Sequence, residues 1–450
     1  MKKDIKYYEL NPSQEVVKLQ CKYTLHKRVI NIITSMSTND ELDFKLMEKA
    51  FNLVVERNDC LRIYFAKHNG KLMQYFRDKV VFENIPVQKF SSQEEFDSFI
   101  NKIKVKPIEY MKGKVIEPYF IVTHDNKYMV LFKLCHLILD VYGINVIYKD
   151  LFEVYDALKN NKELPAAPGS FEEIVKKDLI RKNDKVLYEK HREFFTNLLN
   201  NRPEPYYSGL HGSNHKLWQK RLAKKNRTMK MFFIKNDTEG FAHPINSETT
   251  KRVMQYCKDT GVSPANFLMY TCNLTTSIMN DKIENILPLE LSNCRGTITE
   301  KKCAGTKVQS IGCYTTFDYN KSFIDNFKAY CDQQVQIYKH IGFADMDFEM
   351  LVHKTYNSSF LGTYYSVTYS FIPFTCPAGT EFRVYSNGKC ALPAYIAQLY
   401  DVDKNEITMV YDIQTQIMNG QDVEKFHNNY LKVINLVIDN PEISLNDIKL

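Results

Sequence analysis

The feature that most constrains the fold is the segment 117–158, EPYFIVTHDNKYMVLFKLCHLILDVYGINVIYKDLFEVYDAL. A strand-like run leads to a turn at Asp125–Asn126, and apolar side chains then occupy almost every position up to Leu139. A run that is apolar on both faces is typical of a central strand that is buried on both sides. Beyond Gly143 the apolar residues recur at helical spacing. The segment therefore predicts a strand, a turn, a buried strand and a helix.

The rest of the chain continues this mixture. Residues 41–57 have the apolar spacing of an amphipathic helix. Residues 60–76 indicate two strands joined at His68–Asn69–Gly70, because Asn-Gly adopts the positive φ of a tight hairpin. In the second half, one helix is predicted to end at Gly261 and the next to begin at Ser263–Pro264. Further strands are predicted near residues 227–235, 286–293, 311–319 and 364–374, and residues 407–440 indicate a strand, a turn and a last helix. We predict an α/β fold, layered in the α+β manner.

The length of 450 residues is too great for one hydrophobic core, so two domains are expected. Residues 160–173, NNKELPAAPGSFEE, form a polar stretch with two prolines and a glycine, which is typical of a linker. We predict an N-terminal lobe over residues 1–165 and a C-terminal lobe over residues 166–450, with the site between them.

Composition excludes several classes of protein. Apolar residues are 44% of the chain, yet no uninterrupted apolar run reaches the ~18–20 residues of a membrane span, and no apolar stretch follows Lys2 and Lys3 as in a secretory signal. The eleven cysteines include no CxxC pair, so no metal site is predicted. We expect a cytoplasmic protein that binds no membrane.

The net charge of +7 is mild, but residues 216–230, KLWQKRLAKKNRTMK, are strongly basic. This run is either a solvated helix and loop or a docking patch for an acidic partner. Nucleic acid is not expected as a partner, because aromatic residues are not interleaved with the basic ones and no known nucleic-acid-binding motif accompanies them.

His136 and Asp140 lie where the buried strand ends, in KLCHLILDVYG. A neutral imidazole can accept a proton near pH 7, which makes His136 a candidate general base. If the strand continues through position 136, Cys135 and His136 point to opposite faces, which argues against a Cys–His dyad. On their own, two residues with this spacing are more often a hydrogen-bonded histidine and a helix-capping aspartate than a catalytic pair. A carboxylate in so apolar a loop needs a partner, and Arg295 in LSNCRGT is a candidate.

Several short motifs, in order along the chain, resemble those of one family. They are NPSQEVV at 11–17, LMEKAFNLVVERNDCLRIYF at 46–65, CHLILDVYGINVIYKDLFEVYDAL at 135–158, TGVSPANFLMY at 260–270, and LSNCRGT at 291–297 with IGCYTTF at 311–317. Together they resemble the condensation domains of nonribosomal peptide synthetases, in the chloramphenicol-acetyltransferase-like acyltransferase superfamily. The matching residues of the second and third motifs are Arg57, Leu61, Arg62, Phe65, His136, Asp140, Asp150, Leu151 and Tyr155, and Asn58 stands where the family has a histidine.

The resemblance implies two chloramphenicol-acetyltransferase-like lobes in a V-shaped arrangement. It also implies acyl transfer in natural product biosynthesis, from donors carried on phosphopantetheine arms of carrier proteins. His136 would act as base or would position the attacking amine, and Asp140 would pair with Arg295 to hold the loop. The chain would be a free-standing, monomeric condensation domain with no cofactor of its own.

Two residues depart from the family pattern. Cys135 replaces a first histidine, which matters little because that side chain faces away from His136. Val141 replaces a glycine, and valine at a positive φ would be strained. Gly143 could supply the missing backbone freedom instead.

We consider three hypotheses. The first is a condensation-type acyltransferase that forms an amide, with loop N–H groups at Val141 and Gly143 or the hydroxyl of Ser370 as candidate donors to the oxyanion. The second is a non-catalytic binding or docking protein that keeps the fold. The third is an ester-forming or coenzyme A-dependent acyltransferase, which uses an alcohol or another small-molecule acceptor.

Overall fold

The computed structural model describes residues 5–207, 210, 212, 227–230, 236–343, 345–359, 362–365, 367–390 and 393–450. Its contacts divide the chain into two compact units. Unit 1 comprises residues 1–183, 293–308 and 374–389, and unit 2 comprises residues 184–292, 309–373 and 390–450. The boundary predicted between residues 165 and 166 falls inside unit 1, because helix α5 (Phe171–Lys182) packs there and two later segments return to it.

In unit 1 the described residues form a five-stranded sheet in the order β15-β1-β6-β5-β4 and a separate hairpin, β2-β3. Its strands are β1 (Asn31–Thr38), β2 (Ile63–His68), β3 (Lys71–Phe76), β4 (Val87–Lys89), β5 (Ile116–Val122), β6 (Tyr128–Cys135) and β15 (Thr380–Tyr385). Its α-helices are α1 (Pro12–Tyr23), α2 (Phe44–Arg57), α3 (Gln93–Val105), α4 (Val141–Lys159), α5 (Phe171–Lys182) and α10 (Ile298–Lys301). Short 3₁₀ helices are η1 (Lys27–Ile30), η2 (Asp59–Arg62) and η3 (Tyr110–Lys112).

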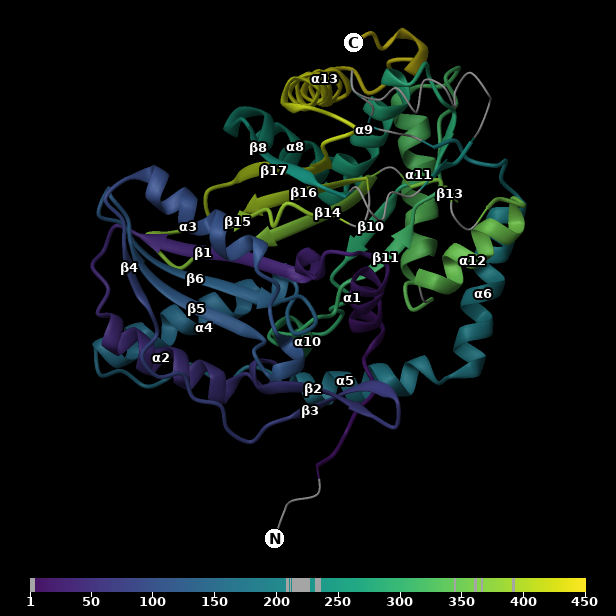
Figure 1. Cartoon of the computed structure of the whole chain (residues 1–450). Coiled ribbons are helices and arrows are strands. Elements are labelled where there is room, and N and C mark those ends of the chain that lie inside the picture. Colours follow the sequence, from purple (N-terminus) through teal and green to yellow (C-terminus); the bar gives the residue numbers. More distant parts are fainter. Residues whose placement is uncertain are drawn as a thin grey trace. The chain divides into compact units, whose positions relative to one another are not determined.

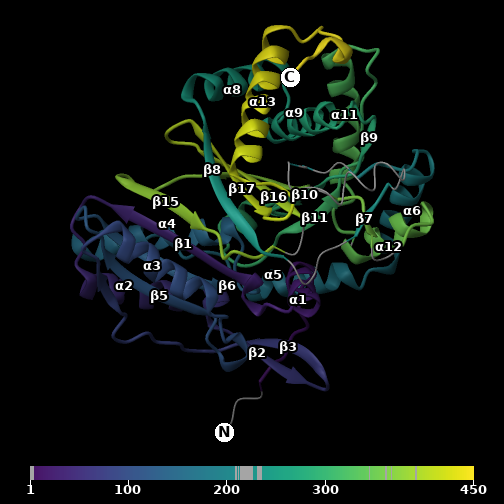
Figure 2. The same ribbon diagram turned by 45° about the horizontal axis from the view of Figure 1, so that its top comes forward.

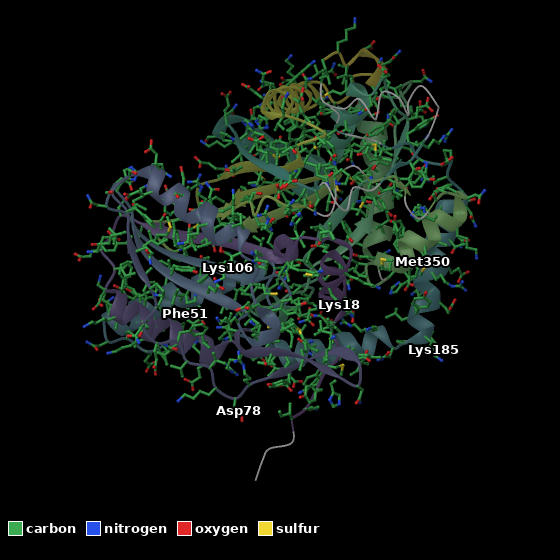
Figure 3. All side chains as sticks on the ribbon, in the orientation of Figure 1. Lys18, Phe51, Asp78, Lys106, Lys185 and Met350 are labelled. Carbon is green, nitrogen blue, oxygen red and sulfur yellow. The ribbon has the colours of Figure 1, made fainter. Side chains whose placement is uncertain are left out.

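Helices cover both faces of this sheet (Figure 1). Helices α2 and α4 lie on one face. Phe51 of α2, which is labelled in Figure 3, packs against Phe132 of β6 with ring centroids 5.4 Å apart. Helix α3 covers part of the other face through Phe96 and Ile100. Burial on both faces explains why β6 is apolar at nearly every position, and the prediction of a central strand is confirmed by its pairing with β1 and β5.

The predicted turns of unit 1 are confirmed. Asn69 and Gly70 both have positive φ, of 49° and 76°, in the β2-β3 hairpin, and Asn126 has a φ of 60° between β5 and β6. Asparagine tolerates this left-handed region better than most residues, so the turns need no other support.

In unit 2 the described residues form a six-stranded sheet in the order β11-β10-β14-β16-β17-β8, together with the short pairs β12-β9 and β13-β7. The strands are β7 (Met229–Lys230), β8 (Thr238–Ile245), β9 (Asn285–Ile286), β10 (Leu289–Ser292), β11 (Gln309–Gly312), β12 (Thr315–Thr316), β13 (Gly362–Thr363), β14 (Val367–Phe374, whose last residue is assigned to unit 1), β16 (Ala394–Asp401) and β17 (Glu406–Gln414). The helices are α6 (Lys185–Asn200), α8 (Ser247–Thr260), α9 (Pro264–Met279), α11 (Phe323–Tyr338), α12 (Asp345–Thr355), α13 (Gly420–Asp439) and the 3₁₀ helix η4 (Leu445–Asp447).

Helix α9 lies at the centre of the core of unit 2, between α8, α11 and α13 (Figure 2). The predicted end of α8 is confirmed, because Gly261 caps it with a φ of 68°. Ser263 and Pro264 begin α9 as predicted, although the Ser263 side chain makes no capping hydrogen bond. The mixed α/β fold predicted from the sequence is thus confirmed.

Two predictions concern parts of the chain that the structure covers incompletely. Most of the basic run 216–230 lies outside the described residues, as do residues 231–235 of one predicted strand. Within the described residues, no helix has both the length and the apolar character that crossing a membrane requires.

Candidate active site

His136 follows directly after β6, in unit 1. Its backbone N–H donates to the carbonyl of Ile30 over 2.9 Å, which extends the pairing of β6 with β1 by one residue. Cys135, the last residue of the strand, is fully buried in the apolar cluster that contains Leu134 and Ile144. Burial raises the pKa of the Cys135 thiol well above its ordinary value, so this cysteine is unsuited to act as a nucleophile.

The imidazole of His136 has a defined proton arrangement. Nδ1 lies 3.0 Å from the carbonyl oxygen of Leu139, which can only accept, so Nδ1 carries the proton. The unprotonated Nε2 of the neutral ring then has its lone pair free. Burial lowers the pKa of His136 from its ordinary value of 6.5, and the Asp140 carboxylate opposes this shift only in part. The half-buried ring is therefore neutral at pH 7, as a general base must be.

Asp140 has two structural functions at once. It is the N-cap of α4, where its Oδ1 accepts from the N–H of Gly143 over 2.7 Å. It also forms a bidentate ion pair with Arg295, whose Nη1 and Nη2 lie 3.0 and 3.1 Å from Oδ2 and Oδ1. Asp140 and Arg295 are only 4% and 5% exposed, so each charge depends on the other for compensation. The two alternatives of a capping aspartate and an ion-paired aspartate are both realised.

A second segment, residues 303–307, closes over this pair. The N–H of Lys307 donates to Asp140 Oδ2 over 2.8 Å, and Arg295 Nη2 donates to the carbonyl of Gly305 over 2.8 Å. Gly305 and Gly143 are in very close contact, because a Cβ on Gly143 would lie 2.8 Å from the carbonyl oxygen of Gly305. The start of α4 is thus held against this segment with no room for a side chain at position 143.

The loop between His136 and Asp140 is held by donors to its carbonyl groups. The hydroxyl of Thr306 donates to the carbonyl of His136 over 2.6 Å, and Nε2 of Gln14 donates to that of Leu137 over 2.9 Å. Asn11 in turn donates from Nδ2 to the carbonyl of Thr306 over 3.1 Å. The NPSQ motif at the start of the chain therefore supports the histidine loop directly and through Thr306.

Val141 is the first residue of α4 and is not among the residues with positive φ. The strain expected at this position is absent, because the helix begins immediately after Asp140. The expectation that Gly143 supplies positive φ is wrong for the same reason, since Gly143 is in the first turn of the helix. The N–H of Gly143 is also occupied by Asp140, whereas an N–H at the first helical position has no partner inside the helix.

Other motif residues are structural. Arg57 pairs with Asp150 of α4, with Nη2 2.9 Å from Oδ1, and Asn58 donates to Oδ2 of the same carboxylate over 2.9 Å. Asn58, which stands where the similar family has a histidine, thus still binds this carboxylate. Tyr155 accepts from the N–H of Asp43 at the start of α2, over 2.9 Å. These contacts fix α2 against α4.

Ser370 lies in unit 2, on β14, and is 5% exposed. Its Oγ lies 2.6 Å from the hydroxyl of Tyr395 on β16. The other candidate residues, His136, Asp140, Val141, Gly143 and Arg295, all belong to unit 1.

Sequence reasoning missed the contribution of residues 303–307, CAGTK. Thr306 donates to the carbonyl of His136, Lys307 donates to Asp140, and Gly305 accepts from Arg295. A segment of five residues without an apolar repeat carries no periodic pattern that would reveal these contacts. The aromatic ring of Tyr142 was also missed; it lies 4.6 Å from the guanidinium of Arg295.

The chain has two α/β units, with a histidine directly after a central strand and an ion-paired aspartate at the start of the next helix, and its fold is chloramphenicol-acetyltransferase-like. A model of the condensation domain matches residues 4–361. The chain belongs to the condensation domain family.

Solved structures and curated relatives agree with this assignment. The first condensation domain of the CDA synthetase is 14% identical, with a TM-score of 0.82 over 99% of both chains. The starter condensation domain of rhizomide synthetase RzmA, in complex with C8-CoA and Leu-SNAC, is 12% identical, with a TM-score of 0.80 over 99% of this chain and 97% of that one. A plipastatin synthase of Bacillus subtilis (strain 168) is 18% identical over 92% of this chain and 16% of the relative, so the chain spans a small part of it. Bacitracin synthase 3 of Bacillus licheniformis is 22% identical over 60% of this chain and 4% of the relative.

Proposed function

We propose that the protein is a condensation-type acyltransferase that forms an amide from an acyl or aminoacyl thioester and an amine. The observation that carries this proposal is the hydrogen bond from His136 Nδ1 to the carbonyl of Leu139, over 3.0 Å. It orients the ring and leaves Nε2 of the neutral imidazole able to accept a proton.

In the proposed reaction the amine nitrogen attacks the thioester carbonyl carbon while Nε2 of His136 takes a proton from that nitrogen. The new C–N bond forms, the C–S bond breaks, and the imidazolium returns its proton to the leaving thiolate. The products are an amide and a thiol. General base catalysis of this kind contributes about 10²–10⁴-fold to the rate.

Negative charge on the thioester oxygen needs a donor during the attack. The N–H of Val141 is at the start of the 19-residue helix α4, whose dipole places partial positive charge there. We assign the oxyanion to this N–H and not to that of Gly143, which Asp140 already occupies. A valine at position 141 can provide this hydrogen-bond donor because the proposed contact needs only its backbone N–H. That the hydroxyl of Ser370 also donates to the oxyanion stays a prediction.

The donor is proposed to be an acyl group on the phosphopantetheine arm of a carrier protein, and the acceptor a small-molecule amine. Coenzyme A is the alternative donor, and one condensation domain of similar fold is described in complex with C8-CoA. That the chain acts as a free-standing, monomeric protein stays a prediction.

The test compares amide formation by the full chain and by His136→Ala, using an acyl-loaded carrier protein with a panel of amines and mass spectrometry of the product. The matched control is His124→Ala, because His124 is exposed in the β5–β6 turn. We expect His136→Ala to lower the rate by about 10²–10⁴-fold and His124→Ala to leave it unchanged. Equal rates for His136→Ala and the wild-type protein would exclude His136 as the base.

The second hypothesis, a non-catalytic binding protein, gives a different result in the same assay. The loaded carrier would then bind, but the amide would form no faster than without the protein. This hypothesis rests on strain at Val141, and the relaxed backbone there weakens it.

A further inference from the structure

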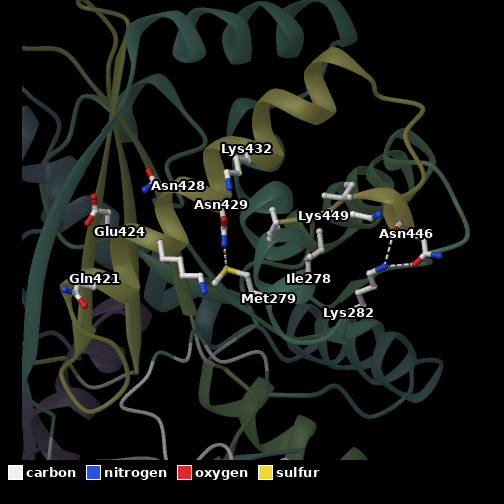
Figure 4. A pocket seen from close by; sticks show the side chains of 13 residues that line it. Ile278, Met279, Lys282, Gln421, Glu424, Asn428, Asn429, Lys432, Asn446 and Lys449 are labelled. Carbon is white, nitrogen blue, oxygen red and sulfur yellow. Dashed lines mark hydrogen bonds between the residues drawn. The ribbon is translucent and has the colours of Figure 1, made fainter.

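A lysine-rich pocket of about 820 Å³ lies in unit 2 (Figure 4). It is bordered by the end of α9, by one face of α13 and by the segment that follows η4. A volume of this size is in the range of small-molecule sites. Its residues have no part in the chemistry assigned to His136.

The charge of the pocket is positive. Four lysines line it, Lys282, Lys425, Lys432 and Lys449, against two negative groups, the side chain of Glu424 and the terminal carboxylate of Leu450. Within the described part of the chain, no ion pair engages the ammonium groups of Lys425, Lys432 or Lys449. Lys282 is differently placed, because its Nζ donates to the backbone carbonyl and the side-chain oxygen of Asn446, over 2.9 and 2.6 Å.

The geometry of α13 brings donors together. Lys425, Asn428 and Lys432 are spaced three and four residues apart, so they share one face of the helix. The Cα atoms of Lys425 and Lys432 are separated by ~10 Å along the helix axis. Both side chains are long and flexible, so their ammonium groups can approach one anion between them. An anion between them would receive two ammonium groups and an amide donor.

The wall opposite these donors is partly apolar. Ile278 and Met279 contribute from the end of α9, and Ile448 contributes from the segment after η4. Asn429 is 7% exposed and directs its Nδ2 to the sulfur of Met279, over 3.6 Å, which holds the two walls together. A ligand that fits both walls combines an anionic group with an apolar group.

We propose that this pocket binds a small organic phosphate of about nucleotide size. Its phosphate would lie against Lys425, Asn428 and Lys432, and its apolar part against Ile278 and Met279. We infer a phosphate group because its several oxygens can each accept from a different lysine ammonium group.

The experiment measures binding of ADP to the full chain by isothermal titration calorimetry, with pyrophosphate and adenosine as the two partial probes. We expect ADP to bind more tightly than pyrophosphate, and adenosine to give no measurable binding. Lys425→Glu/Lys432→Glu should weaken ADP binding by about tenfold or more. The control Lys45→Glu/Lys49→Glu makes the same charge change at two exposed lysines of α2 and should leave binding within about twofold.

Three results would overturn the proposal: no binding of ADP, binding that Lys425→Glu/Lys432→Glu does not weaken beyond the control, or equal affinity for ADP and pyrophosphate. His136→Ala should not change the affinity for ADP. The site in unit 2 can therefore be refuted without affecting the proposed acyl transfer, and the reverse also holds.

Discussion

Asp140 and Arg295 are 155 residues apart in the chain and form a buried bidentate ion pair, with N–O distances of 3.0 and 3.1 Å. The carboxylate accepts two further hydrogen bonds, from the N–H groups of Gly143 and Lys307. Four donors thus converge on one side chain, which joins the loop of His136, the start of α4 and the segment 303–307. The pair does not contact the imidazole by a hydrogen bond, so we infer that it positions the loop and takes no part in proton transfer.

Arg295→Ala should destabilise unit 1 by about 3–5 kcal/mol, because it leaves a buried carboxylate without its countercharge. Since the chain has two compact units, a single unfolding transition need not report this change. The sharper measurement is hydrogen exchange of residues 136–144, which should accelerate. Lys112→Ala, which breaks an exposed pair with Glu109, is the control and should leave exchange there unchanged. Unaltered exchange in Arg295→Ala would show that the other donors suffice.

Gly143→Ala should be destabilising although alanine is the better helix former. The new Cβ would lie 2.8 and 2.9 Å from the backbone O and N of Gly305, and backbone atoms cannot move aside as a side chain can. Overpacking of this kind costs about 1–3 kcal/mol, and the gain in helix propensity is about 0.5–1 kcal/mol, so the balance is destabilising over most of this range. Hydrogen exchange of the first turn of α4 measures the difference in local stability. Gly296→Ala is the matched control, since its Cβ would meet nothing closer than 3.8 Å, and equal stability of the two variants would contradict the prediction.

Local patterns predicted much of unit 1. The apolar run of β6, the Asn126 turn and the Asn69–Gly70 hairpin each follow from a few neighbouring residues, and each is present. Contacts that unit 1 makes with segments far away in the sequence could not be predicted in this way. Residues 293–308 and 374–389 join unit 1 from the far half of the sequence, and no local pattern indicates which unit a segment belongs to.

The candidate site, too, could be predicted from the sequence only in part. The position of His136 after a buried strand, and the need of Asp140 for a partner, follow from sequence and physical chemistry. The conformation of Val141 does not, because a glycine at this position in the similar family suggests positive φ. The backbone conformation of Val141 is set by Asp140, which caps the helix so that α4 begins at Val141 itself.

Thr306→Val should lower kcat by about tenfold with little change in KM. Valine keeps the shape of threonine but removes the hydroxyl that donates to the carbonyl of His136 over 2.6 Å. Loss of this part-buried hydrogen bond costs about 1–2 kcal/mol and would let the histidine loop shift. Thr306→Ser retains the hydroxyl and should restore kcat, as measured in the carrier-dependent amide assay. If the serine variant were as slow as the valine variant, the hydroxyl would not be the group that positions the loop.

The pH dependence of transfer tests the state of His136. A general base must be unprotonated, so activity is lost as the pH falls through the pKa of the imidazole. Burial lowers the pKa of His136 below its ordinary value of 6.5, so the ring stays neutral to lower pH than an exposed histidine does. We expect kcat/KM to be flat around pH 7 and to fall along an acidic limb whose midpoint lies below pH 6.5. Asp140→Asn removes the carboxylate that opposes the shift, so in a folded variant the midpoint should move lower still. A midpoint above 6.5 in the wild-type protein, or an upward move in Asp140→Asn, would mean that a group other than His136 sets the limb.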